Sequence, residues 1–120
     1  MPETEVVLYA ADGKCPFLDW MDKLPPKVQI KCTERVERLR RLGHELRRPE
    51  ADYLRGDIHE LRVRFMSVNY RILYFFSHGK AVLSHGTTKE AQVPEKEIEQ
   101  AIRRRKLFEL DEKSHTYYTD

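Results

Sequence analysis

Three arginines lie close together in the stretch HELRVRFMSVNYRILYFF, residues 59–76. Its apolar and polar residues alternate around a short turn, which predicts two antiparallel strands. Because side chains alternate between the faces of a strand, Arg62, Arg64 and Arg71 fall on one face. Arginine cannot lose its charge, and its planar guanidinium binds phosphate or carboxylate through two hydrogen bonds. Such a cluster needs either acidic neighbours or an external anion.

The turns predict which residues share the arginine face. A turn centred on Ser67–Val68 places Arg64 opposite Arg71, and a turn at His78–Gly79 places Arg71 opposite Gly86. The arginine face then also carries Glu60, Leu73, Phe75, Val82, Ser84 and Gly86. The other face carries Leu61, Val63, Phe65, Tyr70, Ile72, Tyr74, Phe76, Ala81, Leu83 and His85, and we expect helices to cover it.

The arginine face has a structural interpretation as well. Like charges opposite one another destabilise a sheet, and Glu60 is the only acidic residue predicted on this face. Arg62 and Arg64 could belong to a solvated outer face, while Arg71 pairs with Glu60 or with an acid on a helix. The residue pattern leaves this alternative and an anion-binding site equally open.

The other elements follow from periodicity and from turn residues. The pattern predicts four strands, over residues 4–10, 58–65, 69–76 and 80–87. It predicts a short helix over residues 15–24, an amphipathic helix over residues 27–42 and a last helix over residues 93–106. Residues 44–53 are predicted to be a polar loop. This order, β-α-α-β-β-β-α, predicts an α+β domain. We expect a small antiparallel-rich sheet with a helical hairpin and a C-terminal helix packed on it. Residues 1–108 form the domain, and residues 109–120 a polar tail that we expect to be flexible.

Charge and composition narrow the function classes. Residues 53–106 hold eleven basic and six acidic side chains, which is the footprint of an anionic partner. No apolar run is long enough for a membrane helix, and the N-terminus lacks the basic start of an export signal. We interpret Cys15 and Cys32 as reduced thiols of a cytoplasmic protein. A single disulfide between them is the lesser alternative. No metal or cofactor motif is present, so we expect none of either.

Several short motifs together resemble the RelE/HigB group of bacterial toxins, within the RelE/ParE superfamily of toxin–antitoxin systems. They are Leu54–Gly56, Glu60–Arg62, Tyr70–Tyr74, His85–Gly86, Lys89 and Pro94–Arg105, together with FLDWMDKLPPKV earlier in the chain. The resemblance covers about residues 5–108. No single motif is diagnostic, but their order and spacing are fairly specific. Relatives often have an aromatic residue near Thr87 and a second lysine near Glu90. This chain departs from that pattern at both places, and the departure bears on the stacking of an RNA base and on one contact to phosphate.

The resemblance implies a toxin that cleaves mRNA without a metal, usually in the ribosomal A site. It also implies a cognate antitoxin, a small helix-turn-helix or acidic protein that wraps the toxin. Arg62, Arg71 and Lys89 match the family's catalytic basic residues. Arg64 is expected to bind RNA. The basic run at Arg103–Lys106, including Arg103 and Arg104, is expected either to bind RNA or the antitoxin or to complement the dipole at the end of the last helix.

Metal-independent RNA cleavage needs a nucleophile, charge stabilisation and proton transfer. The ribose 2′-OH attacks the adjacent phosphorus and leaves a 2′,3′-cyclic phosphate and a 5′-OH. Arg71 and Arg62 suit the stabilisation of the more negative phosphorane. Glu60 and His85 are the candidates for proton transfer. Each has a structural alternative: an ion pair for Glu60, and a hydrogen-bonded core histidine for His85.

Two other functions fit the same resemblance. A ParE-like inhibitor of DNA gyrase shares the fold but cleaves nothing, so it has no need for a catalytic basic cluster. A non-catalytic module that only holds an antitoxin is the second alternative, and the altered segment at Thr87–Glu90 keeps it open. Arg62, Arg71 and Lys89 favour the ribonuclease over the gyrase inhibitor.

Overall fold

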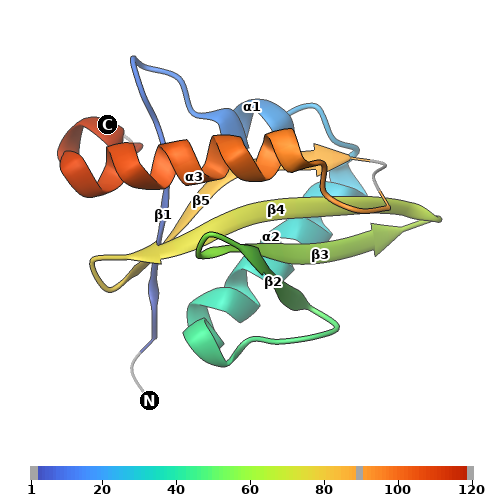
Figure 1. Ribbon diagram of the computed structural model, residues 1–120. Helices are drawn as coiled ribbons and strands as arrows, with labels where there is room; N and C mark the ends of the chain where they lie inside the picture. The colour runs from blue at the N-terminus through green and yellow to red at the C-terminus, as the bar shows by residue number, and fades with distance from the viewer. Residues whose placement is uncertain (1–2, 89–90, 119–120) are drawn as a thin grey trace.

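One five-stranded sheet organises the protein (Figure 1). The computed structural model describes residues 3–88 and 91–118. The strands are β1 (Glu5–Leu8), β2 (Ala51–Arg55), β3 (Ile58–Phe65), β4 (Val68–Ser77) and β5 (Lys80–Thr88), and their order in the sheet is β1-β5-β4-β3-β2. β1 runs parallel to β5, and the other neighbours are antiparallel. The predicted α+β class is confirmed.

Helices cover both faces of this sheet. They are α1 (Pro16–Met21), α2 (Pro26–Leu42) and α3 (Glu95–Leu110), with short 3-10 turns at Gly43–Glu45 and Lys113–His115. α1 and α2 lie on one face and α3 crosses the other (Figure 1). Leu73 and Phe75 on the arginine face are fully buried in one cluster with Phe108 of α3. The apolar end of the arginine face is therefore a second core, which α3 covers.

The strand β2 falls in a segment that we predicted as a polar loop. Among the described strands it pairs with β3 alone, where Asp52 lies opposite Glu60 and Ala51 opposite Leu61. An edge strand leaves one side and part of its faces in solvent, so its sequence need not show the alternation of a central strand. The prediction for residues 51–53 was wrong for this reason.

The turn between β3 and β4 differs from the prediction by one residue. It is formed by Met66 and Ser67, with φ angles of 50° and 70°, and it pairs Arg62 with Arg71 and Arg64 with Asn69. Arg64 is therefore not opposite Arg71, although all three arginines keep their shared face. Methionine and serine are not typical of left-handed turn positions, so the sequence offered no signal for this centre. The turn at His78–Gly79 is as predicted.

An irregularity in β5 exchanges the faces of two predicted residues. Tyr74 pairs with Leu83 but Leu73 pairs with His85, so Ser84 is an extra residue, a β-bulge. His85 consequently joins the arginine face, and its predicted place on the other face was wrong. Gly86 turns toward α1, where an added Cβ would collide with the ring of Trp20. Its predicted place beside the arginines was therefore also wrong.

The C-terminal helix is longer than predicted. α3 ends at Leu110, so the basic run Arg103–Lys106 lies in the body of the helix and its last turn has no basic residue. The prediction that this run complements the dipole of the helix end was wrong. Beyond α3, Thr116 bridges to Tyr9, and the N–H of Tyr117 donates to the carbonyl of Leu8 at 2.8 Å. The division at residue 108 stays a prediction. Within the described residues, no helix is long and apolar enough to cross a membrane.

Candidate anion-binding site

A buried ion pair stands at the centre of the arginine face. Glu60 and Arg71 come from the neighbouring strands β3 and β4, and each is only 6% exposed. Glu60 Oε1 lies 3.0 Å from Arg71 Nε, and Glu60 Oε2 lies 3.8 Å from Arg62 Nε. The close contact lacks hydrogen-bond geometry: within the described residues, Glu60 Oε1 and Arg71 Nε have no hydrogen-bond partner. The two groups attract one another, and the contact leaves these two buried atoms without a hydrogen bond to the described residues.

The carboxyl group of Glu60 is held closer to its neutral form than an exposed one. Burial raises its pKa above the ordinary value, and the positive charges of Arg71 and Arg62 only partly oppose that effect. A carboxylate with a raised pKa is a stronger base than an exposed one and is better suited to take up a proton. The predicted pairing of Glu60 with Arg71 and its predicted candidacy for proton transfer are therefore compatible.

A cavity of about 390 Å³, here called the arginine cavity, opens beside this pair. Its lining includes Glu60, Arg62 and Arg71 from the central strands, Asp52 from β2, and Ala91–Val93 from the segment before α3. Arg71 Nη2 donates to the carbonyl of Ala91 at 3.2 Å. Thr87 lies opposite Arg71 on β5, and its hydroxyl oxygen is buried with no hydrogen-bond partner among the described residues.

A second cavity of about 390 Å³ adjoins the first, because Arg62 and Arg71 line both. Arg64, which we predicted to bind RNA, is exposed and lines this second cavity. Arg35 of α2 lines it too and was not among the predicted site residues. Its Nη1 donates to the carbonyl of Arg62 at 2.6 Å. The position of Arg35 three residues after the buried Cys32 was the signal that it faces the sheet.

His85 lies on the arginine face but is held by protein groups. Its Nδ1 lies 2.8 Å from Ser84 Oγ and 3.0 Å from Arg104 Nη1, and its Nε2 lies 3.0 Å from Glu97 Oε1. Burial lowers its pKa, the charge of Arg104 lowers it further, and Glu97 opposes both. A neutral ring that donates from Nε2 to Glu97 and accepts at Nδ1 satisfies these contacts. Because both ring nitrogens are engaged, the geometry favours the structural role for His85.

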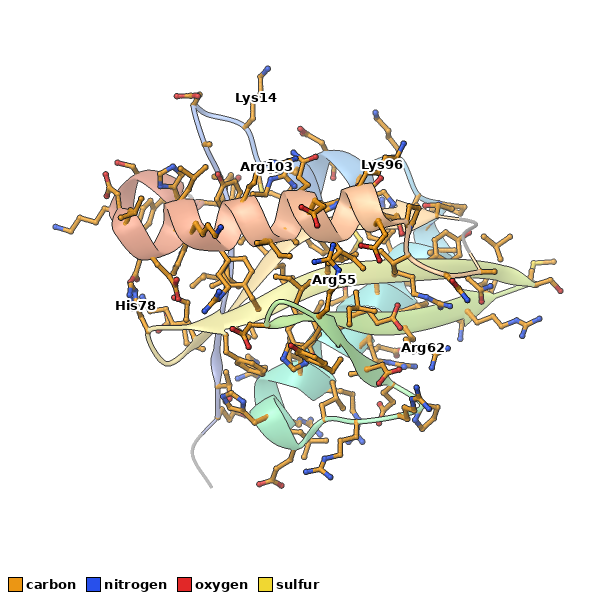
Figure 2. The ribbon with its side chains drawn as sticks, in the orientation of Figure 1. Lys14, Arg55, Arg62, His78, Lys96 and Arg103 are labelled. Carbon is orange, nitrogen blue, oxygen red and sulfur yellow. The ribbon has the colours of Figure 1, made fainter. Side chains whose placement is uncertain are left out.

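The basic residues of α3 form a separate group. Arg104 contacts His85 and lies over the ring of Tyr9, 5.5 Å from its centroid. Arg103 lines another cavity, together with Lys14. Figure 2 shows Arg103 and Lys14 beyond α3, well apart from Arg62. The structure therefore brings Arg62, Arg71 and Glu60 together with Arg64 nearby, but it does not bring Arg103 or Arg104 to them. Lys89 lies outside the described residues.

The fold and this site define a small α+β protein with an arginine-lined cavity on its sheet. Residues 19–106 match the family model of phage-derived Gp49-like proteins (DUF891), so the chain belongs to that family. The family is part of the RelE/ParE-like toxin superfamily and is related to the RelE/HigB toxins. The match spans β2 to β5 and thus the arginine cavity. A search of curated proteins found no match.

Proposed function

We propose that the protein is the toxin of a type II toxin–antitoxin pair and a metal-independent, ribosome-dependent mRNA endoribonuclease. One observation carries the proposal: a buried carboxylate of raised pKa lies within 4 Å of two arginines in an open cavity. Two guanidinium groups and one carboxylate leave a net charge of +1, which suits a phosphodiester. Membership of a toxin superfamily supports the same function.

The proposed reaction assigns one task to each group. Glu60 accepts the proton of the ribose 2′-OH as that oxygen attacks the adjacent phosphorus. Arg71 and Arg62 bind the phosphate oxygens and stabilise the extra charge of the phosphorane. The bond to the 5′ oxygen then breaks, leaving a 2′,3′-cyclic phosphate and a 5′-OH. We assign the proton on that leaving oxygen to Lys89, on the resemblance alone.

The burial of the pair supports a requirement for the ribosome. Little of Glu60 and Arg71 is open to solvent, so an RNA chain can reach them from only a narrow range of directions. Holding the reacting atoms in line lowers the barrier by removing orientational freedom, and a ribosome that fixes the mRNA supplies this. We therefore expect weak cleavage of free RNA.

The test is to produce the protein alone in cells and to map mRNA 5′ ends. We expect cleavage in phase with codons, and Arg71→Ala to reduce it about 10²–10³-fold, the typical effect of removing a charge-stabilising donor. Intact mRNA with gyrase-dependent DNA breaks would overturn the proposal, as would an absence of toxicity.

Matched variants separate chemistry from folding. Arg71→Ala leaves Glu60 buried without its closest partner, which destabilises proteins by several kcal/mol. Arg62→Ala, at a half-buried position, and Arg71→Lys, which keeps the charge but loses the planar fork, should also reduce cleavage. Arg40→Ala is the control, because Arg40 pairs with Glu37 on the surface of α2, and it should cleave normally.

A further inference from the structure

A cavity on the opposite side of β2 has no role in the proposed reaction. It has a volume of about 440 Å³ and is here called the Tyr53 pocket. The buried side chains of Leu46 and Ala51 line it, together with three rings from Tyr53, His59 and His44. Its size suits a small organic ligand, and an apolar lining with a few polar groups is typical of such sites.

Among the described residues, the two histidine rings of the pocket are positioned by packing rather than by hydrogen bonds. The His59 ring stacks on Tyr74 and meets Tyr53 edge-on, each at 5.2 Å between centroids. His44 stacks on Phe76 at 3.6 Å. Tyr53 is 53% exposed, so part of its ring is open to a partner.

The two histidines keep unused polar edges. Among the described residues, neither imidazole makes a hydrogen bond. Burial lowers the pKa of His59, and His44 lowers it further, so this ring is neutral at neutral pH. A neutral imidazole presents one donor and one acceptor. An open aromatic face beside such groups is the combination with which proteins bind unpaired nucleobases.

The Tyr53 pocket continues into the arginine cavity around the edge strand. Arg48, Asp52 and Tyr53 line both cavities. Arg48 and Asp52 form an ion pair between them, with Nη2 2.7 Å from Oδ2. This pair holds the carboxylate of Asp52, and Arg47 adds a further cation to the lining. One polyanion can therefore contact both cavities.

We infer that the Tyr53 pocket binds an unpaired nucleobase of the RNA strand whose phosphate lies in the arginine cavity. The inference rests on the proposed function for the identity of that strand. It assigns to β2 and the loop before it a second part of substrate binding, one that reads a base rather than the backbone.

Small probes test the pocket without the ribosome. The four nucleoside 5′-monophosphates and ribose 5-phosphate are titrated into the whole protein, and the imidazole proton resonances are followed by NMR. We expect at least one nucleotide to shift the resonances of His44 and His59 and to bind more tightly than ribose 5-phosphate. Tyr53→Ala should weaken that nucleotide about tenfold, within the range for one stacked base, and leave ribose 5-phosphate unchanged.

Tyr53→Phe is the matched control, because it keeps the ring and removes only the hydroxyl that accepts a hydrogen bond from the N–H of Asp57. It should bind the nucleotide as the natural protein does. Arg47→Ala is a second variant and should weaken nucleotides modestly. Nucleotides that bind no better than ribose 5-phosphate, or equally well to Tyr53→Ala, would overturn the inference.

The outcome is separable from that of the proposed function. Codon-phased cleavage together with Tyr53-independent binding would remove the base pocket and keep the ribonuclease. Tyr53-dependent nucleotide binding without any mRNA cleavage would remove the ribonuclease and keep the base pocket.

Discussion

Glu60 is the residue on which the proposed chemistry depends. It could act as a base, or it could serve only to hold Arg71 in place. Its 3.0 Å contact with Arg71 Nε fits both roles. Burial raises its pKa, which suits a base, while the ion pair with Arg71 suits a positioning role, so a variant is needed to separate the two.

Glu60→Gln distinguishes the two roles of this residue. The amide keeps the shape and an accepting oxygen but cannot take up a proton. If Glu60 is the base, cleavage should fall about 10²–10⁴-fold, while inorganic phosphate should bind at least as well, since a negative charge is lost from the site. Cleavage rates on purified ribosomes and phosphate titrations measure the two effects.

The pH profile of cleavage provides the control for that variant. The natural protein should gain activity as the pH rises through the raised pKa of Glu60, because only the ionised form accepts a proton. The residual activity of Glu60→Gln should lack this step. Near-normal cleavage by the variant would assign Glu60 to positioning alone.

The bulge at Ser84 decides which side chains β5 presents near the site. It places His85 toward α3 and Gly86 toward α1, and the missing side chain of Gly86 admits the ring of Trp20. Trp20 Nε1 in turn donates to Thr88 Oγ1 at 2.9 Å. The end of β5, opposite Arg71, is thus fixed from the α1 side.

Gly86→Ala should destabilise the protein by about 1–3 kcal/mol, the usual cost of adding a methyl group to a packed core. The free energy of unfolding in urea measures the effect. Trp20→Leu removes the ring that the new methyl group meets, so in the double variant the cost of Gly86→Ala should be much smaller. Equal costs in both backgrounds would show that the contact with Trp20 is not the cause.

At the scale of the whole molecule, the network around His85 joins α3 to the sheet. The folded protein holds His85 at a lowered pKa, whereas the unfolded chain has the ordinary value of about 6.5. The contribution of the neutral His85 ring to the free energy of unfolding is complete above about pH 6.5. It is lost as the pH falls from about 6.5 toward the lowered folded pKa, because the unfolded chain then binds the proton more readily.

His85→Gln should flatten this dependence, since glutamine does not titrate. The free energy of unfolding measured from pH 7.5 downward should fall more steeply for the natural protein than for the variant below about pH 6.5. Taking the difference between the two proteins removes the contributions of other groups, including the opposite effect of Glu60. Parallel curves would contradict the assignment of the shift to His85.

The sequence by itself determined the shared face of Arg62, Arg64 and Arg71. Alternation along a strand is local, so a turn displaced by one residue changed which arginines lie opposite but not their face. It also determined the strands of the central hairpin and the His78–Gly79 turn, because their signals lie within a few residues. The placement of Glu60 beside these arginines follows from the same rule.

Only the tertiary structure decided the rest of the site. β2 forms an edge that brings Asp52 and Tyr53 beside Glu60 and His59, and its own sequence reads as a loop. Around the bulge, Gly86 packs against Trp20 and Ser84 accepts a hydrogen bond from Arg104 of α3, and both partners are distant in the chain. Glu60 lies between Asp52 of β2 and Leu73 of β4, and its burial in the folded sheet raises its pKa. Such contacts join residues far apart in the chain, so no local pattern encodes them.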